Sequence, residues 1–204
     1  MFLDNVQFSK QSWQQRNIII TEKGPLWITL PVLKKENKII NKTEIDTKNR
    51  SFKKIIDTIK FSYSKKKYFD QYFSELEEII LEDNKLLSNL NVKIIKWLCK
   101  SFGINSNFFN ASDLVTGVKD DNDKIERLIN ICKFLKTKIY LSPEGAKNYL
   151  GDAKKKFEKN DIKIIYNNFN LKPFEIDKFN PSAIDLLFNE GKKGFEKILN
   201  SINE

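Results

Sequence analysis

Apolar positions in the central part of the chain recur at helical spacing. From residue 51 to residue 63 they return every three or four positions, which places them on one face of a helix. A second segment continues the pattern towards Leu86, and a third ends at Gly103, a residue type that commonly closes helices. The spacing predicts three amphipathic helices with apolar positions Phe52, Ile55, Ile56, Ile59, Tyr63, Phe69, Tyr72, Phe73, Leu76, Ile79, Ile80, Leu90, Ile94, Trp97 and Leu98.

The segments before these helices have the composition of β-strands. Residues 16–20 and 26–32 are rich in β-branched and apolar side chains, and the turn-forming residues 22–25 lie between them, which predicts a hairpin. Pro31 limits the second strand to an edge or an end of a sheet. Residues 2–7 alternate in part and predict the end of one more strand with its exit loop.

In the last part of the chain, short strands and helices alternate. Strand candidates occur at residues 107–111, 138–141 and 162–166, separated by a helix capped by Asp123 and by a short helix ending near Leu150. Strands that are separated by helices usually pair in parallel, with right-handed crossovers. This order predicts further parallel strands.

The whole chain is therefore predicted to form a single α/β domain. It has a mostly parallel sheet, an N-terminal hairpin and a central helical insertion at about residues 51–103. A length of 204 residues with 40% hydrophobic content is enough to bury a core. A final helical region begins at Pro181 and is interrupted at Gly191 and Gly194.

Several classes of protein are disfavoured by the sequence. Uncharged stretches such as residues 17–21 are far shorter than the roughly 18 apolar residues of a membrane span, so no span is expected and a cytoplasmic location is predicted. Histidine is absent, and Cys99 and Cys132 lie on apolar helical faces, which argues against a disulfide framework and a zinc site. Residues 120–123 are acidic but lack the glycine and glutamate of a calcium loop. Neither a metal nor a cofactor is predicted.

The positive net charge of the chain is weak evidence for a nucleic-acid partner. A net charge of +9 and a pI near 9.3 are typical of proteins with a polyanionic partner. However, 33 of the 36 basic residues are lysines, and they are scattered, with short runs at 65–67 and 154–156. Nucleic-acid readers favour the planar guanidinium of arginine. Nucleic-acid binding is therefore kept only as an alternative.

The predicted topology points to one edge of the sheet as a binding site. Ligands of open α/β sheets bind at the carboxyl ends of the strands, where the exit loops converge. These loops are residues 4–7, 112–113 and 142–145, which we expect to surround a single polar hollow. Asp4 follows apolar residues, so desolvation is expected to raise its pKa into the range of a general base, although a loop-capping role is also open. Ser112 and Ser142 are equally compatible with N-capping of a helix.

The scarcity of arginine makes its positions informative. The chain has only Arg16, Arg50 and Arg127. Arg16 and Arg127 are candidates to hold a phosphate or carboxylate through two parallel hydrogen bonds. The alternative is an ion pair, for Arg127 with Asp113.

An ordered set of short segments resembles the WbqC-like family. No single segment is specific, but together they cover nearly the whole chain. They are residues 4–8, Trp13, 16–18, 26–32, Tyr63, 66–69, 72–73, 127–129, 131–132, 140–146, 149–150 and 181–191.

The resemblance implies a bacterial protein of surface-polysaccharide synthesis, notably of the O-antigen of lipopolysaccharide. The implied activity is transfer of glycine or another aminoacyl group to a nucleotide-linked amino sugar. The donor is left open between aminoacyl-tRNA, a carrier-protein thioester and an adenylate. The alternatives are a noncatalytic nucleotide-sugar-binding or scaffold protein of glycan assembly, and a nucleic-acid-binding protein.

The implied chemistry assigns candidate roles to particular residues. Asp4 or Asp185 would be the base, and Ser142 with the neighbouring amides would stabilise the oxyanion. Arg16 or Arg127 would hold the diphosphate. The further substrate-binding candidates are Gln7, Asn17, Asp113, Gly145 and Tyr149.

Members of the resembled family normally begin with a Gln-Pro-aromatic-Phe-x-Pro segment before the strand that ends at Asp4. This sequence starts after that segment. We therefore expect a shortened first strand and impaired activity.

Overall fold

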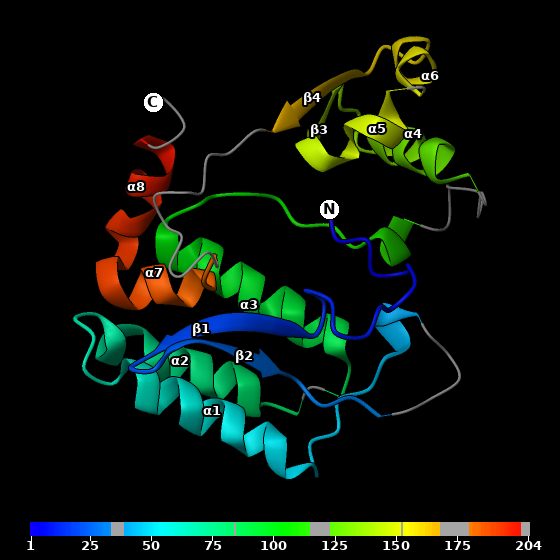
Figure 1. The fold of residues 1–204 in the computed structure, drawn as a ribbon. Helices are drawn as coiled ribbons and strands as arrows, with labels where there is room; N and C mark the ends of the chain where they lie inside the picture. Colours follow the sequence, from blue (N-terminus) through cyan, green and yellow to red (C-terminus); the bar gives the residue numbers. More distant parts are fainter. Residues whose placement is uncertain (34–38, 84, 115–122, 152, 168–179, 201–204) are drawn as a thin grey trace. The chain divides into compact units, whose positions relative to one another are not determined.

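The chain forms two compact units in the computed structural model. The small unit contains Met1–Leu3 and Phe108–Phe169, and the large unit contains Asp4–Asn107 and Asn170–Glu204. Both helices and strands are present, so the mixed character predicted from the sequence is confirmed. The residues described are 1–33, 39–83, 85–114, 123–151, 153–167 and 180–200 (Figure 1).

The large unit begins with the predicted hairpin. Strands β1 (Arg16–Thr21) and β2 (Gly24–Thr29) pair in an antiparallel register that sets Arg16 opposite Thr29. Gly24 has φ of 101°, a conformation that glycine adopts without the strain of a side chain. The second strand ends before Pro31, as its missing N–H requires.

Three helices follow the hairpin, as their periodicity predicted. They are α1 (Arg50–Tyr63), α2 (Phe69–Leu81) and α3 (Leu87–Phe102), and a short 3-10 turn, η1 (Ile40–Lys42), precedes them. The Asn49 side chain accepts a hydrogen bond from the Ser51 N–H at the start of α1, and Gly103 closes α3 with a left-handed conformation.

The predicted continuation of the second helix towards Leu86 is wrong. Helix α2 ends at Leu81 because Glu82 has an extended ψ of 149°. Leu86 instead forms an antiparallel bridge with Glu44. The apolar side chain at position 86 belongs to the approach to α3 rather than to the end of α2.

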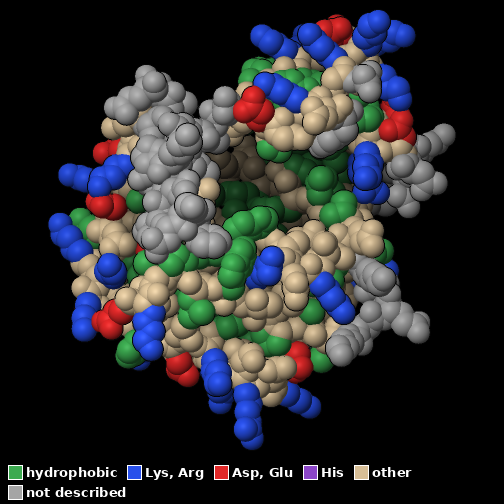
Figure 2. All heavy atoms as spheres, in the orientation of Figure 1, with side chains coloured by type: hydrophobic (Ala, Val, Ile, Leu, Met, Phe, Trp, Pro, Cys, Tyr) green, Lys and Arg blue, Asp and Glu red, His purple; other side chains and the backbone are tan. Residues whose placement is uncertain are grey.

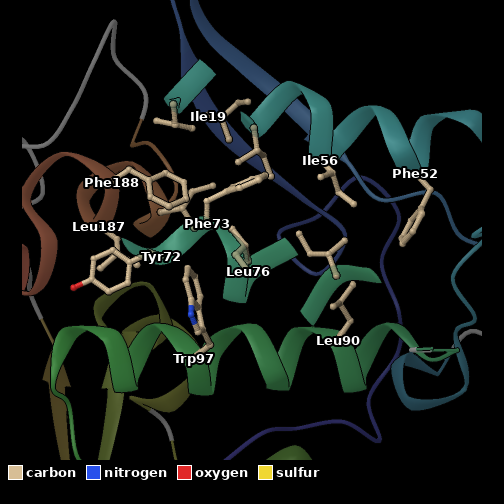
Figure 3. Packing of buried hydrophobic residues seen from close by; sticks show 14 of the residues in the cluster. Ile19, Phe52, Ile56, Tyr72, Phe73, Leu76, Leu90, Trp97, Leu187 and Phe188 are labelled. Carbon is tan, nitrogen blue, oxygen red and sulfur yellow. The ribbon is translucent and has the colours of Figure 1, made fainter. Parts of the chain in front are cut away.

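The core of the large unit is formed by the apolar stripes of these helices, together with β1 and a C-terminal helix. Figure 3 shows side chains from β1, α1, α2, α3 and α7 (Ala183–Glu190) pointing toward one another. The labelled residues are Ile19, Phe52, Ile56, Tyr72, Phe73, Leu76, Leu90, Trp97, Leu187 and Phe188, all of them buried.

Helix α7 is attached to the hairpin and to the loop before α2. The Ser182 N–H donates to the Ile18 carbonyl at 2.7 Å, and the Tyr68 N–H donates to the Phe188 carbonyl at 3.0 Å. Gly191 follows with φ of +62°, and a Cβ there would come within 2.9 Å of the Tyr68 ring. Glycine is therefore required at the predicted interruption, which separates α7 from the turn η5 (Gly191–Lys193) and from α8 (Gly194–Asn200).

The small unit is built on one parallel strand pair. Strands β3 (Ile139–Pro143) and β4 (Lys163–Asn167) pair with Ser142 opposite Tyr166. The connecting helices bury a second apolar cluster that contains Ile129, Leu150 and Phe157. These helical segments are α4 (Lys124–Phe134), η3 (Glu144–Ala146), α5 (Lys147–Leu150) and α6 (Lys154–Glu158).

The prediction of a mostly parallel sheet is not confirmed. The described strands form one antiparallel pair and one parallel pair. The predicted strands at residues 2–7 and 107–111 are reduced to a single parallel bridge between Phe2 and Asn110. The chain leaves the extended conformation at once after this bridge, because η2 (Ala111–Leu114) begins there and a turn begins at Asp4.

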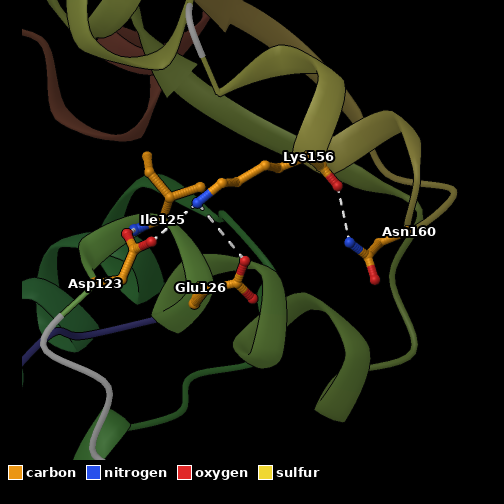
Figure 4. A network of polar contacts seen from close by, with 5 residues as sticks. All are labelled: Asp123, Ile125, Glu126, Lys156 and Asn160. Carbon is orange, nitrogen blue, oxygen red and sulfur yellow. Dashed lines mark hydrogen bonds and ion pairs between the residues drawn. The ribbon is translucent and has the colours of Figure 1, made fainter.

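Helix α4 begins at Asp123, as predicted. The Asp123 carboxylate accepts hydrogen bonds from the Ile125 N–H at 2.8 Å and from Lys156 Nζ at 3.0 Å, and Lys156 Nζ lies 3.9 Å from Glu126 (Figure 4). The hydrogen bond from Lys156 and the one from Ile125 lower the pKa of Asp123. Residues 120–122, which precede this cap, lie outside the described residues.

This N-cap is expected to make a small contribution to stability that depends on pH and salt. The lowered pKa means that the contribution is present above the ordinary aspartate pKa and is lost as the pH falls through the folded value. Asp123→Ala should lower the melting temperature slightly at pH 7, and less at 1 M salt, which screens the exposed pair with Lys156. Asp123→Asn is the control, because its side-chain oxygen still caps the helix. Equal melting temperatures for all three proteins at low salt would contradict this assignment.

Candidate functional site

The predicted site residues divide between the two units. Asp4, Gln7, Arg16, Asn17 and Asp185 belong to the large unit. The others, namely Asp113, Arg127, Ser142, Gly145 and Tyr149, belong to the small unit. A single hollow shared by the two groups stays a prediction, and the geometry of each unit is considered alone.

Ser142 occupies an unusual position in the small unit. It lies near the carboxyl end of β3 and is only 1% exposed. Its Oγ is buried and makes no hydrogen bond to any of the described residues. The alternative role as a helix N-cap is therefore wrong, since Pro143 precedes η3 and no side chain caps it. The hydroxyl is therefore a buried polar group without a partner among the described residues.

The segment after Ser142 leaves space at its backbone. A Cβ added to Gly145 would have no atom within 4 Å, so packing inside the chain does not require glycine there. Lys147 Nζ forms an ion pair with Glu144 at 2.7 Å and lies 5.6 Å from the centroid of the Tyr166 ring. No sequence pattern indicated a role for Lys147 or Tyr166, and only the β3–β4 register shows that Tyr166 is the partner of Ser142.

The other predicted residues of the small unit lie on the helices. Asp113 is exposed in η2 and accepts a hydrogen bond from Asn110 Nδ2 at 2.9 Å. Arg127 is half-buried on α4, a helix that contacts η2. Tyr149 belongs to α5. Substrate-binding roles for these residues stay predictions.

In the large unit, Arg16 stacks on an aromatic ring. Its guanidinium carbon lies 4.2 Å from the centroid of the Trp27 ring, and the Trp27 centroid lies 5.2 Å from that of Trp13. Among the described residues no carboxylate forms an ion pair with Arg16, and its buried Nε has no hydrogen-bond acceptor. The predicted alternative of an ion pair is thus replaced by a cation–π contact.

Three other predicted residues take part in interactions with the backbone of the large unit. Asn17 Oδ1 accepts a hydrogen bond from the Ile18 N–H at 2.8 Å. Gln7 pairs with Ile39 in an isolated antiparallel bridge. Asp4 is 8% exposed, and its carbonyl accepts a hydrogen bond from the Asn41 N–H at 3.0 Å.

Asp185 is part of a buried polar chain that the sequence analysis did not anticipate. The Tyr63 hydroxyl accepts a hydrogen bond from the Ile20 N–H at 2.9 Å and donates its own proton to the Asp185 carboxylate. Burial raises the pKa of Asp185, and the hydrogen bond from Tyr63, the charge of Lys66 and a hydrogen bond from Asn189 only partly oppose this rise. A carboxylate with a raised pKa is suited to act as a general base. The same hydrogen bonds of Asp185 also attach α7 to α1 and β1.

Charged side chains of both signs lie on the face of the molecule that Figure 2 shows. Figure 2 shows lysine and arginine side chains spread over the visible surface of the large unit, with aspartate and glutamate between them. In the part of the chain that the structure describes, no three acidic or cysteine side chains gather as metal ligands. Nor does any helix within the described ranges combine the length and apolar character needed to cross a bilayer.

Comparison with known proteins gives one family and one similar relative. The family model described as the WbqC-like protein family matches residues 1–197. "Uncharacterized protein Rv1507c" of Mycobacterium tuberculosis is 30% identical over 198 residues, which is 92% of this chain and 82% of that protein. No solved structure matches the chain.

Proposed function

The chain belongs to the WbqC-like protein family, and from this membership we propose that it is an aminoacyl transferase of bacterial surface-polysaccharide synthesis. The proposed reaction joins glycine, or another amino acid in activated form, to the amine of a nucleotide-linked amino sugar. The proposed pathway is assembly of a polysaccharide such as the O-antigen of lipopolysaccharide.

The observation that supports this proposal is the unpaired hydroxyl of Ser142. A buried polar group without a hydrogen bond costs roughly 1–3 kcal/mol, so such groups are rare unless a ligand supplies the missing partner. Ser142 lies at the carboxyl end of a parallel strand, where α/β proteins bind ligands. In the proposal its hydroxyl donates to the carbonyl oxygen of the aminoacyl group, on which negative charge develops during attack.

The proposed reaction balances without a cofactor. The sugar amine forms a bond to the acyl carbon, and the bond between that carbon and the donor's oxygen or sulfur leaving group breaks. The amine loses one proton to a base, and the leaving group departs as an alcohol, thiol or phosphate.

Ser142→Ala tests the proposal. We expect the wild-type protein to form an aminoacyl-sugar nucleotide, detected by mass spectrometry, from an amino-sugar nucleotide and a glycyl thioester, glycyl adenylate or glycyl-tRNA. The variant should lose roughly tenfold in kcat, the value of one hydrogen bond made in the transition state. Its free energy of unfolding should stay equal or rise, because the substitution removes a buried hydroxyl that has no partner.

The stability measurement separates this role from a structural one. Ser74→Ala makes the same chemical change at an exposed position of α2 and should alter neither property. A Ser142→Ala protein that is less stable but equally active would show that the hydroxyl serves the fold. If the wild-type protein gives no product with any of the three donors, the transferase proposal fails.

A second function is favoured by the contact between Arg16 and Trp27. A cation on an exposed aromatic ring is suited to bind a nucleotide sugar without any chemistry at Ser142. The protein would then present nucleotide sugar to another enzyme of glycan assembly. Saturable binding without an aminoacyl product would support this function.

A further inference from the structure

Two tryptophans and an arginine form a partly exposed cluster on the large unit, here called the Arg16 platform. It consists of Arg16, Trp27 and Trp13. Trp13 is 65% exposed and Trp27 is 39% exposed, although their ring centroids are only 5.2 Å apart. Exposed indoles forgo part of the roughly 25 cal/mol per Å² gained by burying apolar surface. Two adjacent exposed indoles with a cation on one of them therefore need an explanation other than core packing.

The hairpin holds the platform in place. Arg16 is opposite Thr29 in the register, so alternation puts Arg16 and Trp27 on the same face of the strands. The turn that carries Trp13 is tied to both strands. Gln15 Nε2 donates to the Leu30 carbonyl at 2.8 Å, and the Leu30 N–H donates to the Gln15 carbonyl at 2.9 Å. These contacts hold the turn that carries Trp13 against the hairpin that carries Arg16 and Trp27, as a preorganised site requires.

The guanidinium of Arg16 has no carboxylate partner within the described residues. Its carbon lies 4.2 Å from the centroid of the Trp27 ring and its Nε is buried, so an anion would have to bind the two terminal Nη groups. The edge of a stacked guanidinium can still donate two parallel hydrogen bonds to phosphate oxygens. The exposed face of an indole, for its part, stacks well on a planar nucleobase, at roughly 1–3 kcal/mol per base.

We infer that the Arg16 platform binds a nucleoside diphosphate, with the base stacked on Trp13 and the diphosphate against the N–H edge of Arg16. A nucleoside diphosphate joins a planar nucleobase to an anionic diphosphate. These two groups match the indole of Trp13 and the guanidinium of Arg16, which lie in the same platform. The inference deepens the proposed function by assigning recognition of the nucleotide to the large unit. The inference rests on the proposed function in one respect, namely that the bound diphosphate carries a sugar.

Direct binding measurements with the full chain test the inference. Isothermal titration with UDP, GDP, CDP, ADP and dTDP should find at least one ligand with a Kd below about 1 mM. The matching nucleoside and inorganic pyrophosphate should each bind at least tenfold more weakly, because each occupies only half of the platform. Trp13→Ala and Arg16→Lys should each lower the affinity for the nucleoside diphosphate roughly tenfold. The first variant loses the stacking on the base, and the second loses the paired hydrogen bonds to the diphosphate.

The variants allow a sharper comparison. Trp13→Ala should leave the weak binding of pyrophosphate unchanged, while Arg16→Lys should reduce it. Matched controls are Phe61→Ala, an aromatic side chain that is 78% exposed, and Arg50→Lys at the exposed start of α1. Both controls should bind like the wild type. Circular dichroism should show the same melting temperature for all four variants.

Three results would overturn the inference. They are the absence of binding by every nucleoside diphosphate, an affinity equal to that of the wild type in both Trp13→Ala and Arg16→Lys, and binding of the free amino sugar in preference to the diphosphates. Binding does not depend on turnover. Platform-dependent binding without an aminoacyl product would thus leave this inference intact while the transferase proposal fails.

Discussion

Replacing Phe188 with alanine is expected to lower the free energy of unfolding by about 3–5 kcal/mol, the usual range for an aromatic residue removed from a well-packed core. Phe188 is fully buried, and its ring centroid lies 5.2 Å from that of Tyr63 and 5.4 Å from that of Phe69. These two rings belong to α1 and α2, so Phe188 joins the C-terminal helix to the central ones. The cavity left by the ring would weaken both contacts together.

Urea unfolding followed by circular dichroism measures this effect. Phe61→Ala is the matched control, because the same side chain is 78% exposed on α1 and its loss should cost less than about 0.5 kcal/mol. Phe188→Leu should recover part of the loss by refilling the cavity. A loss below about 1 kcal/mol in Phe188→Ala would mean that α7 contributes little to the stability of the large unit.

The core around Phe188 shows how much the sequence could predict. The helical spacing from Phe52 to Leu98 predicted which side chains face the core, because one apolar stripe per helix must be buried. The same spacing extended the second helix too far, since Leu86 fits its stripe. Local backbone geometry at Glu82 ended the helix, and nothing in the apolar pattern signals that geometry.

The extent of strand pairing was harder to predict. Apolar runs at residues 138–141 and 162–166 became a parallel pair, but similar runs at 2–7 and 107–111 gave one bridge. A short apolar run reports burial rather than hydrogen bonding, so it cannot show how many partners a strand finds. For this reason the predicted mostly parallel sheet was too large.

The candidate site was only partly accessible to sequence reasoning. Ser142 was selected as a residue following a strand, but its unpaired hydroxyl depends on packing around β3 and could not be predicted. Trp13 and Trp27 lay within segments that resemble the family, and their exposure was the missing information. The hydrogen bond between Tyr63 and Asp185 joins positions more than 100 residues apart, and no local pattern connects them.

Tyr63→Phe is expected to lower the free energy of unfolding by about 2 kcal/mol between pH 7 and pH 9. The substitution keeps the ring but removes the hydroxyl, which leaves the Ile20 N–H without its partner and Asp185 without its donor. A buried group that loses its partner costs roughly 1–3 kcal/mol. Urea unfolding at several pH values measures both this difference and its pH dependence.

The difference should shrink above pH 10, because only the wild type has a proton to lose at this position. Burial, the main cause, raises the pKa of Tyr63 above the ordinary value of about 10. Between the two pKa values the folded protein keeps the phenol proton and the unfolded chain releases it. The unfolded state therefore binds fewer protons, and the free energy of unfolding falls as the pH rises. The curves for wild type and Tyr63→Phe should converge, whereas a constant difference up to pH 11 would contradict a buried phenol.

Asp185→Asn tests the charge of Asp185 separately from its hydrogen bond with the Tyr63 hydroxyl. The asparagine oxygen still accepts the Tyr63 proton but carries no charge that burial disfavours. Because burial raises the pKa of Asp185, the folded protein keeps this proton above the ordinary aspartate value, and the wild type loses stability as the pH rises through the folded pKa. The variant lacks that loss, so its stability relative to wild type should increase from pH 4 towards neutrality. An opposite trend would mean that the ionised carboxylate, held by Tyr63, Lys66 and Asn189, stabilises the attachment of α7.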